Sequence, residues 1–183
     1  SICGSYHCID EYCALDRPLK CNKNSPMAQS SPPDTFDRAI LRLLQRDNKM
    51  PQRAIAEAVN LSTAAVQRRI AAMEQSGIIT HNVAIVNTRA VQMTITAIVE
   101  VKLVNEHLAT VDYAKALFHA APEVQQCYYV TGGLSFVLVI VVADMIAYEG
   151  TTRRLFAQNE AVASYHSFIA LDRVKALAEI VIP

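Results

Sequence analysis

The first half of the chain carries apolar side chains at helical spacing in three short segments. The first segment, residues 34–47, predicts a helix that opens on a good capping residue. The second, residues 52–59, follows Pro51, whose missing N–H is no loss in a first helical turn. The third starts at Ser62, a favourable N-cap, and ends at Gly77. The front of the chain is therefore predicted to form three short helices.

The second and third of these helices are joined as a helix-turn-helix requires. Asn60 tolerates the left-handed conformation of a tight turn, and Ala56 is small where the two helices approach closely. The third helix has an apolar inner stripe of Val66, Ile70 and Met73. Its opposite face combines small residues with arginine and glutamine: Ala64, Arg68, Ala71 and Gln75, with Gln67 and Arg69 on the flanks. This is the helix-turn-helix pattern.

The outer face of the third helix differs from an ordinary solvated face, which is rich in Glu and Lys. Small residues permit close approach to a groove, and Arg or Gln side chains reach phosphates and base edges. We therefore expect double-stranded DNA as a partner, with these candidate residues: Lys49, Ser62, Thr63, Ala64, Gln67, Arg68 and Arg69. Arg68 and Gln67 are expected to reach bases. Lys49, Arg69 and the first turn at Ser62 are expected to contact phosphates. The alternative is a three-helix bundle that binds no nucleic acid.

The second half of the chain alternates between strand-like and helical patterns. In order they are a strand, a helix, two strands joined by a turn, a helix and a strand, over residues 93–103, 111–121, 124–130, 136–142, 144–156 and 162–171. This β-α-β-β-α-β order predicts a ferredoxin-like domain, with both helices on one face of an antiparallel sheet. The other face is left without cover, so we expect the chain to dimerise through it.

The composition fits a folded chain with a slightly basic front. The 183 residues are 52% hydrophobic and 19% charged, with mean hydropathy +0.19, which excludes wholesale disorder. Residues 34–81 hold seven Lys or Arg against five Asp or Glu, whereas residues 82–183 hold seven against nine. A polyanion is therefore expected at the front.

Membrane and targeting signals are not evident in the sequence. The longest apolar run, Phe136–Ala143, is too short for a membrane helix, which needs about 20 residues. No charged-then-apolar leader opens the chain. We therefore expect a cytoplasmic protein that does not bind a membrane.

Four of the five cysteines crowd into the start of the chain beside His7: Cys3, Cys8, Cys13 and Cys21. Their spacings lack the paired C-x2-C turns of zinc ribbons, so we expect no metal site. Residues 1–33 are interpreted as a disordered or cloning-derived extension, of which residues 1–26 are expected to be dispensable. Cys127 lies in a strand-like run and is expected in the core rather than as a nucleophile.

Segments spaced across both halves carry a family resemblance. They are Asp37–Leu41, Ile55–Ser62, Val66–Ile70 and Met73–Ile79 in the front, with Pro122–Val124, Cys127–Gly132, Asp144–Glu149 and Val174–Lys175 in the back. Residues 34–183 resemble the Lrp/AsnC (feast/famine) transcription regulators of bacteria and archaea. The family usually has glycine where this chain has Asn60, a replacement that the turn should survive.

The resemblance implies an α+β protein of two domains. Residues 34–81 would form a winged-helix-like helix-turn-helix domain that binds DNA, and residues 82–93 a linker strand. Residues 94–183 would form the ferredoxin-like domain that binds an effector and oligomerises. It also implies dimers that assemble toward octamers, and a nucleoid-associated protein of the bacterial or archaeal cytoplasm.

The resemblance further implies an effector site, often for an amino acid, between subunits. The matching residues are Thr131, Gly132, Gly133, Leu134, Ser135, Phe136, Tyr165 and Ser167. Relatives usually carry two acids in this loop, which are absent here, and two threonines in place of Tyr165 and Ser167. Gly132 and Gly133 still permit a nest of N–H groups for a carboxylate. An ammonium group would lack its anion, so we expect tight binding of free amino acids to be lost, unless the family's acids only orient the loop.

Three functions remain open at this point. The chain is predicted to be a DNA-binding transcription regulator, with an amino-acid-like effector as a further expectation and with neither cofactor nor catalytic residues. One alternative is an architectural DNA-binding protein without an effector. The other is an enzyme similar to siroheme decarboxylases, which resemble the family in both halves. The face around Arg68 argues against the enzyme, as does the scatter of four histidines: His81, His107, His119 and His166.

Overall fold

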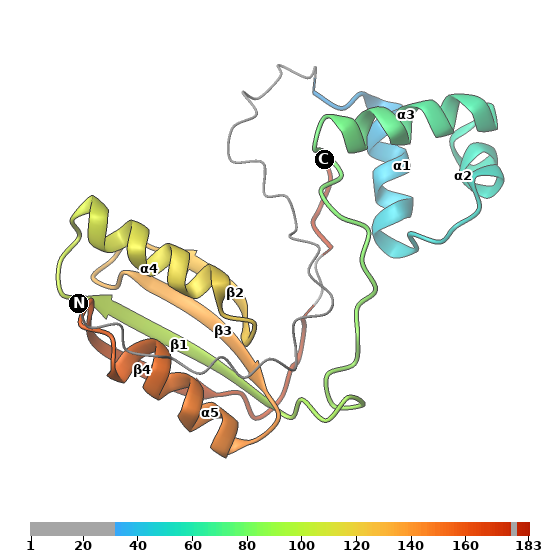
Figure 1. The fold of residues 1–183 in the computed structure, drawn as a ribbon. Coiled ribbons are helices and arrows are strands. Elements are labelled where there is room, and N and C mark those ends of the chain that lie inside the picture. The colour runs from blue at the N-terminus through green and yellow to red at the C-terminus, as the bar shows by residue number, and fades with distance from the viewer. Residues whose placement is uncertain (1–31, 177–178) are drawn as a thin grey trace, which may run out of the picture. The chain divides into compact units, whose positions relative to one another are not determined.

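The computed structural model describes residues 32–176 and 179–183, which fall into two compact units (Figure 1). The first unit contains the described residues up to Asn82 together with Ile180–Pro183, and the second is Val83–Glu179. The last four residues thus belong with the first unit, which corrects their assignment to the second domain. The extension expected over residues 1–33 lies, up to residue 31, outside the described residues.

The first unit is built from three helices, as predicted: α1 (Thr35–Arg46), α2 (Gln52–Val59) and α3 (Thr63–Gln75). Asn60 ends α2 in the left-handed conformation, with φ of 54°. Leu61 then donates its N–H to the carbonyl of Ala56 at 3.0 Å, which closes the turn into α3. The core between the helices consists of apolar side chains from all three: Ile40, Ile55, Ala56, Val59, Val66 and Met73.

The C-terminal segment of the chain is held along α1 by two polar side chains. The amide of Gln45 pairs with the backbone of Ile180 in both directions, as donor at 3.1 Å and as acceptor at 2.9 Å. The guanidinium of Arg42 donates to the carbonyl of Ile182 at 3.2 Å and to the oxygen of Pro183 at 2.9 Å. These contacts explain why the segment belongs to the first unit.

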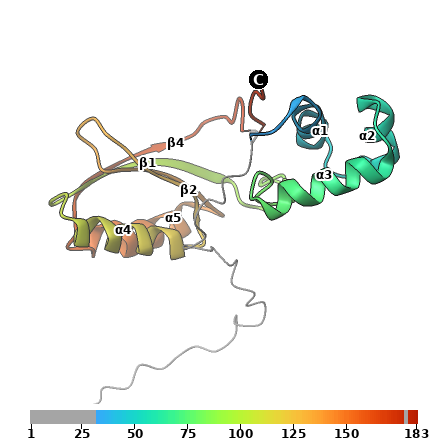
Figure 2. The ribbon, with the colours of Figure 1, turned by 90° about the horizontal axis from the view of Figure 1, so that it is seen from above.

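The second unit is an antiparallel sheet with helices on one face (Figure 2). Its elements are β1 (Ile95–Leu103), α4 (Leu108–Ala120), β2 (Val124–Tyr129), β3 (Phe136–Val142), α5 (Met145–Thr152), a π-helical turn η1 (Arg153–Ala157) and β4 (Val162–Ile169). The strand order is β2-β3-β1-β4. The predicted ferredoxin-like α+β fold is therefore confirmed.

The two faces of this sheet differ in their cover. Alternate residues of β1, such as Val99 and Val101, are fully buried beneath the helices in the second core. The residues between them face outward, where strand pairing places Ile98 between Val139 and Phe168. The side chains of Ile98 and Phe168 are 42% and 55% exposed. An apolar row therefore crosses the uncovered face of the sheet.

Two expectations for the second unit are wrong. Residues 82–93 form no strand: they run as an extended linker that ends in a hydrogen-bonded turn, where Met93 donates to the carbonyl of Thr88 at 2.8 Å. Cys127 is exposed rather than in the core, because β2 is an edge strand that pairs with β3 alone. In the described part of the chain, no helix is long and apolar enough to cross a membrane.

Candidate nucleic-acid interface and effector loop

The beginning of α3 presents small polar residues to solvent. Ser62 caps the helix: its Oγ accepts a hydrogen bond from the N–H of Ala65 at 3.2 Å. Thr63 and Ala64 follow and are exposed. Because the first N–H groups of a helix have no partner within it, this end of α3 suits a phosphate group.

The candidate base-reading side chains are free to contact a partner. Arg68 and Gln67 are exposed on α3, and neither forms a hydrogen bond or ion pair with the rest of the described chain. Small side chains at Ala64 and Ala71 flank them on the exposed side of the helix. Lys49, in the loop between α1 and α2, is likewise exposed with an ammonium group that no described residue binds.

Arg69 is in a different situation from its neighbour Arg68. Its Nη1 lies 2.7 Å from the carboxylate of Asp34 and 2.8 Å from that of Asp37, both at the start of α1. The guanidinium also lies over the ring of Phe36, 5.5 Å from its centre. The two carboxylates raise the pKa of Arg69. The structure therefore directs Arg69, expected at phosphates, toward α1.

The loop between β2 and β3 has an exposed tip and a buried end. Thr131, Gly132 and Gly133 are exposed, and the two glycines have φ of 107° and 94°. At these angles a side chain would be strained, so the loop depends on glycine here. Leu134 is half-buried, and Ser135 is 1% exposed. Only the tip of the loop is thus available to a ligand.

Two of the expected effector residues have structural contacts instead. The Oγ of Ser135 accepts from the N–H of Leu103 at 2.9 Å, and its hydroxyl donates to Glu106. Phe136 is fully buried in the core, where its ring meets that of Phe118 edge-on at 5.3 Å. Ser135 and Phe136 therefore hold the loop in place, which corrects the expectation that they face an effector.

An acid that the sequence reasoning missed stands beside this loop. Glu106, from the segment between β1 and α4, accepts from the hydroxyls of Ser135 and Tyr129, the latter at 2.8 Å. These hydrogen bonds lower the pKa of Glu106, the one from Ser135 most. Its side chain remains exposed. The loop itself contains no acid, as expected, but an acid from a segment about 25 residues earlier in the chain contacts Ser135 within it.

Tyr165 and Ser167 lie apart from this loop within one chain. Both are on β4, on the helix side of the sheet, where the ring of Tyr165 packs against Phe156 at 5.0 Å. Strand pairing puts β3 and β1 between the loop and β4, so about 10 Å separates them. Buried Tyr148 of α5 adjoins this pair; burial raises its pKa, and the Ser167 hydroxyl offsets part of the rise. A single chain does not gather the expected effector residues.

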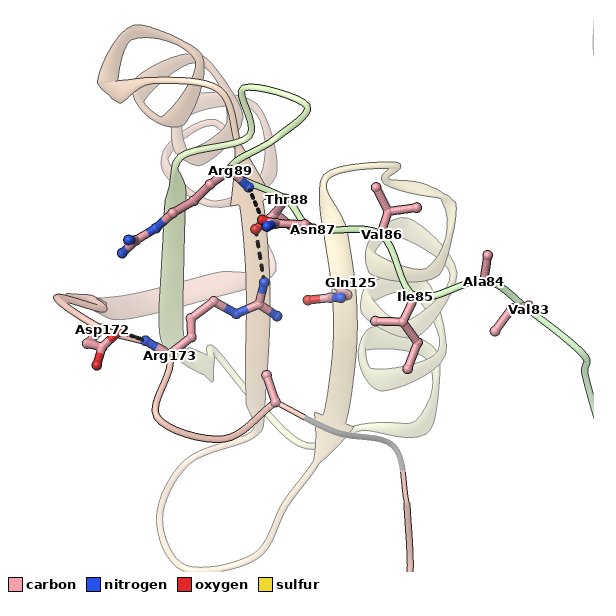
Figure 3. Close-up of a pocket in the computed structure, with 11 residues that line it drawn as sticks. Val83, Ala84, Ile85, Val86, Asn87, Thr88, Arg89, Gln125, Asp172 and Arg173 are labelled. Carbon is pink, nitrogen blue, oxygen red and sulfur yellow. Dashed lines mark hydrogen bonds between the residues drawn. The ribbon is translucent and has the colours of Figure 1, made fainter. Parts of the chain in front are cut away.

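A cavity of about 630 Å³ lies elsewhere in the second unit, between the linker and the segment after β4 (Figure 3). Its lining includes two arginines, and the guanidinium of Arg173 donates to the hydroxyl of Thr88 at 3.1 Å. Gln125, which also lines it, is at the start of β2, whereas the effector loop follows the end of that strand. The cavity and the loop are therefore separate features.

Metal-binding geometry is not found in the part of the chain that the structure describes. Among residues 32–176 and 179–183, no group of three or more His, Cys, Asp or Glu could hold a metal ion. The four clustered cysteines, from Cys3 to Cys21, lie outside these residues.

Comparison with known proteins agrees with both units. Residues 96–180 match the family model of the Lrp/AsnC ligand binding domain, and residues 33–80 match that of winged helix-turn-helix DNA-binding domains. An uncharacterized HTH-type transcriptional regulator of Sinorhizobium fredii is 37% identical over 143 residues, which cover 78% of this chain and 85% of that protein.

Solved structures show the same architecture. An AsnC family transcriptional regulator from Agrobacterium tumefaciens aligns with a TM-score of 0.75 and 30% identity, over 80% of this chain and 95% of that one. A feast or famine regulatory protein from M. tuberculosis, complexed with L-methionine, aligns with a TM-score of 0.74 and 29% identity, over 82% and 99% of the two chains. The chain belongs to the Lrp/AsnC family of transcriptional regulators.

Proposed function

We propose that this regulator reads DNA by placing α3 in the major groove. The observation that carries the proposal is the exposed, unpaired side chain of Arg68, beside Gln67 and among small residues. A bidentate contact from arginine to guanine contributes about 1–3 kcal/mol of discrimination between bases. Ser62 with the first turn of α3, and Lys49 in the loop between α1 and α2, would contact phosphates.

The test starts from DNA that the protein itself selects. Genomic fragments recovered with the purified protein define a preferred site, and affinity for that site is then measured at fixed salt. Arg68→Ala should weaken binding about tenfold or more while the fold stays intact. Arg153→Ala, which removes one positive charge from η1 of the second unit, is the matched control. Equal affinity of wild type and Arg68→Ala would show that another face reads the bases.

We further propose that a small, amino-acid-like effector binds at the tip of the β2–β3 loop. The exposed glycines there suit a carboxylate, and the nearby carboxylate of Glu106 suits an ammonium group. Since Tyr165 and Ser167 lie about 10 Å away across the sheet, a second subunit would complete the site.

Calorimetry with each of the twenty amino acids at millimolar concentration tests this effector site. We expect binding of at least one, weakened about tenfold in Glu106→Gln, because a hydrogen bond to a charged group contributes about 1.5–3 kcal/mol. Glu149→Gln, on α5 and paired with Arg153 at 2.6 Å, is the control. Binding of none would favour the architectural DNA-binding protein without an effector.

We propose no catalytic role for the chain. The relatives are transcriptional regulators, and the exposed Arg68 and Gln67 of α3 support a role in DNA binding. The purified protein should therefore be colourless and should not bind a tetrapyrrole. An absorption band that appears on titration with siroheme would instead support an enzyme similar to siroheme decarboxylases.

A further inference from the structure

Arg69 of α3 forms ion pairs with two acids at the start of α1, and these contacts have no part in the proposed base reading. The Asp34 carboxylate caps α1 through Oδ1, which accepts from the Asp37 N–H at 2.8 Å. The Asp37 carboxylate returns the bond through Oδ2, which accepts from the Asp34 N–H at 3.2 Å. Each carboxylate turns its other oxygen to Arg69. The two carboxylates that form the capping box of α1 therefore also bind the Arg69 side chain of α3.

The immediate surroundings of Arg69 do not favour a phosphate. Two carboxylates face one guanidinium, so the local charge is negative, and 49% of the Asp34 side chain is exposed. The Arg69 side chain is only 29% exposed, and Phe36 covers one side of it. A phosphate that approached Arg69 would meet both acids.

The contact also has a geometric consequence for α3. Successive residues of a helix point about 100° apart, so the direction of the Arg69 side chain sets that of Arg68. Arg69 joins the start of α1 to the middle of α3 by ion pairs, in addition to the apolar core that packs between the helices. Packing of apolar side chains is less directional than a pair of charge-assisted hydrogen bonds.

We propose that Arg69 is a positioning residue: by binding Asp34 and Asp37 it fixes the rotation of α3, and so aims Arg68 and Gln67 at the bases. This inference rests on the proposed DNA binding by α3. It replaces the phosphate contact that the sequence suggested for Arg69, and it assigns the acids of α1 a part in sequence specificity through their contact with Arg69.

The test compares specific and non-specific binding in two variants of opposite charge change. Arg69→Gln and Asp37→Asn are each titrated with the selected site and with a random duplex of equal length, over a series of salt concentrations. Arg69→Lys, which keeps the charge but not the forked geometry, is the conservative variant. Circular dichroism melts ensure that every protein is measured well below its unfolding transition.

We expect both variants to lose about tenfold in affinity for the selected site and to keep their affinity for random DNA. The result for Asp37→Asn is decisive, because removing a negative charge should otherwise tighten DNA binding. The salt dependence of Arg69→Gln should match that of wild type, and the double variant should be no worse than either single one. Arg69→Lys should fall in between.

Other outcomes overturn the proposal in distinct ways. A phosphate contact at Arg69 would lower the slope of log K against log salt by about 0.9 in Arg69→Gln, with tighter binding in Asp37→Asn. A role in stability alone would lower the melting temperature and leave the affinity of the folded protein unchanged for both the selected site and random DNA. If wild type itself does not prefer the selected site over random DNA, the proposed function fails, and the positioning role with it.

Discussion

Arg68 of α3 is exposed, whereas its neighbour Arg69 is paired with Asp34 and Asp37. This pairing also affects the ionisation of Asp34. The pKa of Asp34 is lowered, first by the N–H of Asp37 and then by Arg69. A carboxylate whose pKa is lower in the folded chain than its ordinary value of 3.8 stabilises the fold above that pH. This contribution is lost as the pH falls through the lowered pKa. The free energy of unfolding of the DNA-binding unit should therefore fall as the pH drops through the lowered pKa of Asp34.

Asp34→Asn tests this coupling, because asparagine still caps a helix but does not titrate. At about pH 7 the variant should be less stable than wild type, and the difference should shrink as the pH falls below about 3.8. Urea unfolding midpoints measured along this range report the effect. A difference in stability that is constant with pH would contradict the part given to the Asp34 charge.

The contacts of Glu106 and Arg69 could not be predicted from the sequence, unlike the cap and the turn of the helix-turn-helix. The cap at Ser62 and the turn at Asn60 depend on neighbours a few positions away, so they were readable from local pattern. Arg69 meets acids 32 and 35 residues away, and Glu106 meets a serine 29 residues away. Such contacts depend on how elements pack, which helical or strand periodicity does not specify.

The elements themselves were more predictable than their edges. All three helices of the first unit and the β-α-β-β-α-β succession of the second followed from periodicities of about 3.6 and 2. The strand that the family resemblance implies over residues 82–93 is absent from the structure. Val83 and Ile85 in this segment are more than half exposed, and no strand in the described part of the chain pairs with them. A strand needs a hydrogen-bonded neighbour as well as a pattern.

The turn between α2 and α3 gives a prediction at the scale of an element. Asn60 has φ of 54°, a conformation that costs residues with a Cβ about 1–2 kcal/mol and that asparagine tolerates better than most. Asn60→Ala should therefore lower the free energy of unfolding by about 1 kcal/mol. Asn60→Gly, which restores the family's usual residue, should equal or exceed wild-type stability. Denaturant unfolding measures both.

The same two variants, Asn60→Ala and Asn60→Gly, also test whether the turn between α2 and α3 affects DNA binding. If the turn only joins the helices, both variants should bind the selected site as wild type does once they are folded. A loss of affinity in Asn60→Gly at full stability would indicate that a flexible turn lets α3 move, and that the Asn60 side chain restricts it.

At the scale of the whole molecule, the uncovered face of the sheet is the surface that a second copy would fill. We propose that two chains pair through it, since exposed Ile98 and Phe168 form an apolar row with Val139 there. Such a row costs free energy in water, at about 25 cal/mol for each Å² of apolar surface. A two-fold dimer would present two copies of α3, so the preferred DNA site should be a pseudo-palindrome.

Ile98→Lys tests this dimer, because a charge in the middle of a paired apolar face has no partner and is costly to bury. Light scattering at micromolar concentration should show at least a dimer for wild type and a monomer for the variant. Ile146→Lys, at a position on α5 that is 82% exposed, is the control and should still dimerise. The monomer should retain its fold and its weak binding to a single half-site, but lose most of its affinity for the full site, since two linked contacts bind far more tightly than one. A dimeric Ile98→Lys protein would place the interface on another surface and would remove the reason to expect a palindromic site from this face.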